Sequence, residues 1–415
     1  MRRIMLTALA LVAALGITAS TATTATTETG ITPTTVTIGA TFPLSGPASS
    51  YGVIPVAFKA YISYINARKG PDGKRGVGGR QIVFKYYDDG YNPANSVQNA
   101  RKLVEQDKVF AVVGALGTEV NRAIRPYLNG NKVPHLFTAS GDTTFGRDTK
   151  EWPWTIGYLP NYQFEGRTYG LKIAKNSPNA KIAVIYQNDD FGNDLLTGLK
   201  AGLGAKASNI VGEEAYEVTA PSIQGQIAKL KATGATVFLI FATPKFAAQS
   251  YVFANALKWS PTVIYTTGVT ATTAVLGASQ KACGGCDLVN RTLTYLYAKD
   301  PANPKWDSDA GMILYRKVMA KYVPSGNAAD SFYLYGVATA HAFVQLLTKA
   351  GPNPTRAGLM KAVRAWNETN PFLLPGNRQK TGPGDQFPIN CIQIAKFTDG
   401  KLLPVSQLQC ETPGK

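Results

Sequence analysis

The chain has 415 residues, which is too many for one ordinary domain and enough for two. Its content of 45% hydrophobic and 17% charged residues is that of a globular protein and excludes an intrinsically disordered one. The formal net charge is +17, but lysine and arginine are spread thinly without a basic run, so we expect a solvated surface and no nucleic-acid partner.

The N-terminus has the pattern of a secretory signal peptide. Arg2 and Arg3 precede a short apolar run, and small residues suited to cleavage follow it. The apolar run is too short to favour a membrane span, and no cysteine follows it for a lipid anchor. We therefore expect residues 1–22 to be a signal peptide, residues 23–35 to be a flexible spacer, and the product to be exported to the periplasm without a lipid anchor.

Strand and helix signals then alternate in a first round. A helix with Pro55 in its first turn follows the first strand, and Asn92-Pro93 opens a second helix. The third helix carries Pro126 and should be short or kinked there. Strands are predicted over residues 36–42, 81–87, 109–113 and 135–138.

The alternation restarts after Trp154. Strands are predicted over residues 181–186, 236–241 and 262–266 and within 210–218, with helices between them. Such alternation implies an α/β fold of parallel sheets with helices on both faces. Two rounds predict two lobes whose C-terminal strand ends face each other across a cleft, where open α/β sheets bind ligands.

The pattern changes after Thr292. Helices are predicted over residues 309–322, 331–350 and 355–366, and a hairpin closes the chain. We expect this segment to return to the first lobe and then cross to the second. The predicted division is residues 36–155 plus 291–370 for lobe 1 and residues 156–290 plus 371–415 for lobe 2.

Four cysteines in an exported protein can be oxidised. Asp399-Gly400 is a hairpin signal, and that hairpin brings Cys391 near Cys410. Cys283 and Cys286 form a CxxC pair that could staple a loop, act in redox chemistry or supply half a zinc site. Because no second CxxC or nearby histidine completes a zinc site, we favour the staple and expect no metal.

Catalytic motifs are missing from the sequence, so we expect neither an enzyme nor a cofactor. P-loop, GxGxxG, HExxH and GxSxG patterns do not occur. The two histidines, His135 and His341, lie in apolar segments and fit a core. Asp88-Asp89 and Asp189-Asp190 follow strands and fit loop caps better than catalytic dyads, because adjacent residues of an extended segment point to opposite faces.

Small polar residues directly follow two consecutive strands, in Leu116-Gly117-Thr118 and in Ala139-Ser140-Gly141-Asp142. Thr118 can cap a helix that begins at Glu119, and such a helix start is an anion site. These turns could grip the charged end of a small molecule. They could equally be ordinary βα turns, and the residues alone do not separate the two interpretations.

Five segments together resemble the periplasmic solute-binding proteins of branched-chain amino-acid ABC transporters, the Leu/Ile/Val-binding-protein family. The likeness spans essentially the whole mature chain. It implies a periplasmic binding protein type I fold, with two Rossmann-like lobes joined by three hinge crossovers that close on ligand. The segments are IGATFPLSGPASSYG, KYYDDGYNPANSVQNARKLVEQDKVFAVVG, LFTASGD, KIAVIYQNDDFGNDLLTGLK and VFLIFATPKFAAQS.

The resemblance also implies a ligand site. In that family, hydroxyls and backbone N–H groups of the first lobe hold a carboxylate, an aromatic residue lines the side-chain pocket, and second-lobe residues complete the site. The matching residues are Tyr51, Leu116, Gly117, Thr118, Ala139, Ser140, Gly141 and Asp142 in the first lobe and Phe191, Thr243 or Pro244, Thr267 and Gly268 in the second.

Two departures from the family leave the ligand open. Amino-acid binders carry an acid near Thr267-Gly268 that pairs with the α-ammonium, and the stretch TTGVTAT has none. Asp142 stands where a hydroxyl is common. Either Asp142 holds the ammonium, or the solute is an aromatic or aliphatic carboxylate without one.

The resemblance also implies a partner. We expect a monomer that delivers a small carboxylate-bearing solute, either a hydrophobic amino acid or another carboxylate, to an inner-membrane ABC permease. The alternative is a sensory subunit that presents its closed form to a membrane receptor.

Overall fold

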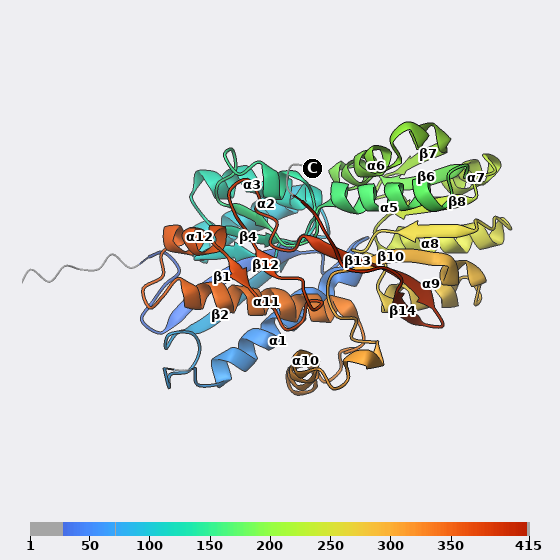
Figure 1. Cartoon of the computed structure of the whole chain (residues 1–415). Helices are drawn as coiled ribbons and strands as arrows, with labels where there is room; N and C mark the ends of the chain where they lie inside the picture. Colours follow the sequence, from blue (N-terminus) through green and yellow to red (C-terminus); the bar gives the residue numbers. More distant parts are fainter. Residues whose placement is uncertain (1–27, 71, 413–415) are drawn as a thin grey trace, which may run out of the picture.

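The computed structural model describes residues 28–70 and 72–412. The predicted signal peptide and the first part of the predicted spacer lie outside the described residues. The described chain forms two α/β units, each with its own sheet and covering helices (Figure 1). Among the described helices, none combines the length and the apolar character needed to cross a bilayer.

The end of the predicted spacer is packed and not flexible. Ile31 is buried and forms an isolated β-bridge with Val36. Strand β1 (Thr35–Phe42) already begins at Thr35. The spacer prediction is therefore wrong for this part, because an apolar side chain can be buried there against the first sheet.

The first sheet has the strand order β2-β1-β3-β4-β5, and all of its neighbouring strands are parallel. Its side chains alternate between the faces: Ala111 and Val113 join the core under α1 and α11, whereas Val112 joins the core under α2 and α3. The elements are β2 (Gln81–Asp88), β3 (Ala111–Val113), β4 (His135–Thr138), β5 (Thr155–Gly157), α1 (Val53–Ala67), α2 (Pro93–Arg101), α3 (Thr118–Gly130), α4 (Thr144–Arg147) and α11 (Ser331–Lys349).

Helix α3 corrects one prediction and narrows another. It begins at Thr118, its N-cap is Gly117, and no side chain caps it, so Thr118 does not cap a helix that begins at Glu119. Gly117 has a φ of 109°, a conformation that favours glycine. The helix also continues through Pro126 over 13 residues, so it is not short, and a kink at Pro126 stays a prediction.

The second sheet has the order β7-β6-β8-β9-β10-β13-β14, with β15 paired to β13. It is parallel from β7 to β10, and β13 runs antiparallel to its neighbours. Helices α5 and α6 share an apolar core on one face, and α7, α8 and α9 share one on the other. The elements are β6 (Ile182–Gln187), β7 (Ile210–Tyr216), β8 (Val237–Phe241), β9 (Val263–Thr266), β10 (Thr292–Leu296), β13 (Cys391–Thr398), β14 (Lys401–Pro404), β15 (Gln409–Cys410), α5 (Tyr162–Asn176), α6 (Asp190–Leu203), α7 (Gln224–Ala232), α8 (Pro244–Ala256) and α9 (Thr273–Ala282).

The chain passes between the two sheets after β5, after β10 and before β13. Helices α10 (Ala310–Tyr322) and α12 (Arg356–Arg364) lie between the last two passages and pack in the core of the first unit with α11. This matches the expected α/β fold with two parallel sheets and three crossovers. Strand β10, however, belongs to the second sheet, although the predicted lobe division gave residues from 291 onward to lobe 1. The exact lobe division stays a prediction.

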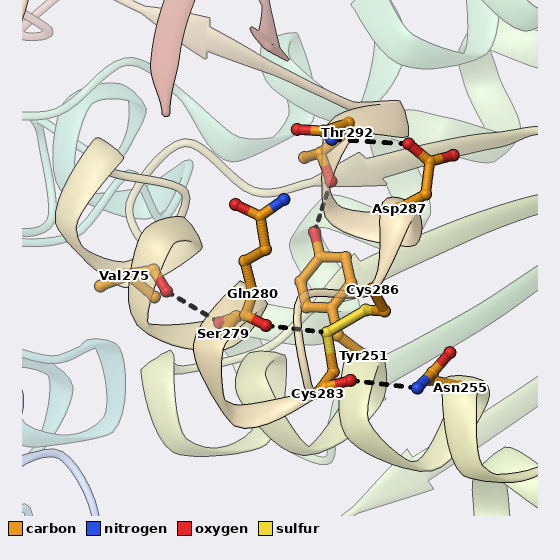
Figure 2. Close-up of a disulfide and its surroundings, with 10 residues drawn as sticks. Tyr251, Asn255, Val275, Ser279, Gln280, Cys283, Cys286, Asp287 and Thr292 are labelled. Carbon is orange, nitrogen blue, oxygen red and sulfur yellow. Dashed lines mark hydrogen bonds between the residues drawn. A yellow bond between two sulfur atoms is a disulfide. The ribbon is translucent and has the colours of Figure 1, made fainter. Parts of the chain in front are cut away.

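Both expected cysteine pairs are bonded. Cys391 is joined to Cys410, which ties β15 to β13, and Cys283 is joined to Cys286 directly after α9. Figure 2 shows the second bridge beside α8, where Asn255 donates to the carbonyl oxygen of Cys283 at 3.1 Å. The CxxC pair therefore staples a loop at the edge of the second unit.

Candidate functional site

A cavity of about 100 Å³ is lined by both units, at the ends of their parallel strands. The turns after β3 and β4 form part of its wall, and residues after β6, β8 and β9 form the facing part. Eight residues predicted from the sequence line it, namely Tyr51, Leu116, Gly117, Thr118, Ala139, Phe191, Thr243 and Gly268.

The first-unit wall is built around the start of α3. Thr118 is the first helical residue, and its Oγ1 lies 2.8 Å from the Oγ of Ser140. A Cβ on Gly117 would lie only 2.7 Å from the ring of Tyr91, so glycine permits the ring to close over this turn. Because the first N–H groups of a helix have no intrahelical acceptor, this wall offers donors to an anion.

Asp142 lies outside the lining, which corrects its predicted contact with the ligand. Its carboxylate is fully buried and pairs with Arg122 at 2.6 Å. It also accepts hydrogen bonds from the N–H and Oγ1 of Thr144, at 2.8 and 2.7 Å. These contacts use both carboxylate oxygens and compensate the charge, so Asp142 stabilises the turn from outside the cavity lining.

Ser140, Gly141 and Thr267 also lie outside the lining and support it. The Oγ of Ser140 accepts from the N–H of Asp142 at 3.1 Å. The carbonyl oxygen of Gly141 accepts from the N–H of Tyr162 at 2.8 Å. The hydroxyl of Thr267 donates to a carboxyl oxygen of Glu165 at 3.1 Å.

Glu165 is an acid that the local sequence around Thr267-Gly268 did not reveal. It lies on α5, is fully buried, and its second carboxyl oxygen accepts from the N–H of Gly268 at 3.0 Å. Burial raises the pKa of its carboxyl to about 8, although the hydrogen bonds from Gly268 and Thr267 oppose the rise. Glu165 therefore stabilises the Thr267-Gly268 turn through two hydrogen bonds and is mostly protonated at neutral pH.

Aromatic side chains make up much of the remaining wall, and the sequence prediction missed most of them. The rings of Tyr51 and Phe332 lie 4.8 Å apart, and those of Tyr162 and Phe191 lie 5.1 Å apart. The alternating sequence of residues 292–297, Thr-Leu-Thr-Tyr-Leu-Tyr, could have indicated two of them, because alternate residues of a strand lie on the same face and Tyr295 and Tyr297 therefore share one. The missed aromatic residues are Tyr91, Tyr158, Tyr162, Tyr295, Tyr297, Phe332 and Tyr335.

The two charged residues of the lining already have partners. The Nζ of Lys299 donates to both carboxylate oxygens of Asp309 at 2.7 Å. Asp300 accepts from the hydroxyl of Thr273 at 2.7 Å and from the N–H of Ala302 at 3.1 Å. The cavity is therefore apolar in character, with few polar groups at defined places.

The two units touch along one rim of the cavity. Arg122 on α3, besides its pair with Asp142, forms an ion pair with Asp190 at the start of α6. The hydroxyl of Thr143 donates to the carboxylate of Asp194 at 2.8 Å, and the hydroxyl of Tyr51 lies 3.2 Å from that of Thr270. These contacts join the two units directly.

The two histidines and Asp189 have the structural surroundings expected of them. The Nε2 of His135 lies 2.7 Å from the Oδ1 of Asn121, and burial lowers its pKa to about 3. The Nδ1 of His341 lies 2.7 Å from the hydroxyl of Tyr61, and burial lowers its pKa to about 4. Asp189 caps α6 through the N–H of Gly192.

Within residues 28–70 and 72–412, no group of three histidine, cysteine or acidic side chains is placed to hold a metal ion.

The sequence of residues 35–401 matches the family described as periplasmic binding protein. A Leu/Ile/Val-binding protein homologue of Brucella melitensis is 26% identical over 204 residues, which are 49% of this chain and 53% of that protein. The chain thus spans about half the length of the curated relatives it matches.

Solved structures share the fold over nearly the whole chain. A branched-chain amino-acid ABC transporter protein of Thermus thermophilus with bound valine has a TM-score of 0.76 at 16% identity and covers 91% of this chain and 97% of its own. A solute-binding protein of Rhodopseudomonas palustris in complex with 3,4-dihydroxybenzoic acid has a TM-score of 0.74 at 20% identity. It covers 92% of this chain and 99% of its own. These likenesses show the fold alone. The family match, which covers most of the sequence, shows that this chain belongs to the periplasmic binding protein family.

Proposed function

We propose that this protein is the periplasmic solute-binding component of an ABC importer. It captures a small carboxylate-bearing solute between its lobes and delivers it to an inner-membrane permease. The observation that carries the proposal is the cavity between the strand ends, with the start of α3 and Thr118 on one side and aromatic side chains from both units around it. A helix start and hydroxyls suit a carboxylate, and the rings suit an apolar body.

The charges around the cavity favour a solute without an ammonium group. Asp142 pairs with Arg122, and burial raises the pKa of the carboxyls of Glu165 and Asp300, which disfavours their ionised forms. A buried ammonium that finds no free carboxylate pays a large desolvation cost. This argues for a plain aromatic or aliphatic carboxylate over an α-amino acid, and related folds are known with both kinds of ligand.

The test compares two acids with the same carbon skeleton. The mature protein is titrated by calorimetry with 3-phenylpropanoate and phenylalanine, and then with 4-methylpentanoate and leucine. We expect the plain acid of at least one pair to bind at least tenfold more tightly than its amino acid. If no carboxylate binds while a sugar or nucleotide does, the proposed function is wrong. Tighter binding of the amino acids would reject only the charge argument.

Delivery to a permease needs a separate test. Deletion of the gene should abolish uptake of the best-bound acid by whole cells, and the gene supplied in trans should restore it. Unchanged uptake would contradict the role in transport.

A further inference from the structure

Two hydroxyls of the cavity wall, those of Tyr295 and Tyr335, are buried without a hydrogen-bond partner among the described residues. Tyr295 lies on β10, lines the cavity and is 1% exposed. Its hydroxyl oxygen is buried and has no hydrogen-bond partner among the described residues. Leaving such a group unsatisfied in the interior is costly, so a native site usually provides a partner for it.

Neighbouring hydroxyls of the same wall do have partners. The hydroxyl of Tyr158 bonds to Gln379 and accepts from Asn370 at 3.1 Å. That of Tyr51 lies 3.2 Å from the Oγ1 of Thr270. The missing partners therefore do not reflect a general shortage around the cavity. Of the two unpartnered tyrosines, Tyr335 lies on α11 in the first unit, like the start of α3, and Tyr295 lies on β10 in the second.

The ring of Tyr295 cannot easily turn to find another partner. A Cβ on Gly268 would lie 2.4 Å from its Cε1, so the ring rests directly against the backbone of that turn. The ring of Tyr297 also lies near it, with 6.1 Å between the centroids. The ring is fixed at the wall, and its hydroxyl keeps its proton because burial raises the tyrosine pKa well above its usual value.

We infer that Tyr295 sets specificity by hydrogen bonding to an oxygen of the solute other than its carboxylate. This rests on the proposed function. The carboxylate belongs at the start of α3 in the first unit, whereas Tyr295 belongs to the second. The rings of Tyr51, Phe332, Tyr162 and Phe191 favour a flat body between these groups. The solute class is thus an aromatic acid that carries a hydroxyl or oxo group.

The experiment measures binding of benzoate, 3-hydroxybenzoate and 4-hydroxybenzoate to the full-length mature protein by calorimetry. We expect at least one hydroxybenzoate to bind about three- to tenfold more tightly than benzoate, the size of one net hydrogen bond. Tyr295→Phe should remove that preference and weaken binding of the preferred hydroxybenzoate more than that of benzoate. Tyr265→Phe is the matched control, since Tyr265 is buried in the adjacent strand β9 outside the cavity lining. It should keep the preference.

Three outcomes separate the possibilities. An equal loss for benzoate and the hydroxybenzoates in Tyr295→Phe would mean that Tyr295 holds the carboxylate, which overturns the inference. A wild-type protein that prefers benzoate, or a preference that survives Tyr295→Phe, also overturns it while the proposed function stands. If the wild type binds none of these acids and no acid of the earlier pairs, the proposed function itself fails.

Discussion

Thr118 is the residue at which the proposed carboxylate contact is most directly testable. Its hydroxyl lies at the cavity wall at the first position of α3 and 2.8 Å from the Oγ of Ser140. Thr118→Ala should weaken binding of the best acid by about 1–3 kcal/mol, because one hydrogen bond to a charged group is lost. Calorimetry measures the change, and Thr118→Ser should recover most of it. An affinity that is unchanged in Thr118→Ala would exclude a contact between this hydroxyl and the solute.

Asp142 should matter for stability and not for the choice of solute. Asp142→Asn removes the charge that faces Arg122 at 2.6 Å, so the free energy of unfolding should fall by about 1–3 kcal/mol. The affinity ratio between 3-phenylpropanoate and phenylalanine should stay as in the wild type. Denaturant unfolding and calorimetry check the two parts. A changed ratio would show that the carboxylate of Asp142 reaches the solute after all.

Glu165 gives the protein a pH-dependent stability. The carboxyl is protonated in both states below its unfolded pKa of 4.5; as the pH rises toward the folded pKa of about 8, only the unfolded chain loses its proton. Stability therefore falls between these two values and levels off above them. Glu165→Gln cannot ionise, so its melting temperature should change less than that of the wild type between pH 5 and 8. Scanning calorimetry would contradict this assignment if the two proteins lost stability in parallel.

The same three residues show what the sequence could and could not predict about the site. Thr118 was predictable because small polar residues that follow a strand lie at the end of a parallel sheet. The role of Glu165 was not predictable, because its hydrogen-bond partner Thr267 lies 102 residues further along the chain. The pairing of Asp142 with Arg122 depends on the rotation of α3 about its own axis, which the spacing of apolar residues in the sequence does not determine.

At the level of elements, alternation and turn residues predicted the strands and helices of the two rounds and α10, α11 and α12, but not β5, β10, α4 or α9. The errors occur where tertiary contacts compete with local signals. Helix α3 begins one residue earlier than expected, because Gly117 takes up the unusual φ of 109° and frees Thr118 to bond Ser140. It continues through Pro126 with Ile124 and Leu128 held in the core. A packed apolar face can outweigh the lost hydrogen bond of one proline.

The contact between Thr143 and α6 should control how long the closed form lasts. Thr143→Val keeps the shape of the side chain but removes the hydroxyl that donates to Asp194 across the rim. We expect the affinity for the best acid to fall about two- to tenfold through faster dissociation, with unchanged selectivity among acids. Stopped-flow kinetics measures the rates. Thr197→Val is the control, because Thr197 lies on the exposed side of α6, and equal rates in both variants would reject the closure contact.

For the whole molecule, the two rounds of strands and helices predicted two parallel sheets, and the family resemblance added the three crossovers. The assignment of β10 to the second sheet was not predictable from spacing alone, since the strand precedes a segment that packs with the first unit. The aromatic walls were missed for a similar reason. Tyr295 and Phe332 lie in apolar segments, whose sequence does not distinguish core residues from cavity residues. Both line one cavity only once the two lobes are assembled.

Because both units line the cavity and touch along its rim, solute binding and closure should be one coupled event. We expect the solute-free protein to populate a more open form, since the ion pair of Arg122 with Asp190 can separate into water at little cost. A saturating acid at 100 times its Kd should raise the free energy of unfolding by about 2.7 kcal/mol and reduce the radius of gyration. Small-angle X-ray scattering and denaturant unfolding measure the two effects on one sample. Stabilisation at a constant radius of gyration would mean that the protein is already closed without solute, and the solute would then enter by local opening of the rim instead of by a hinge motion.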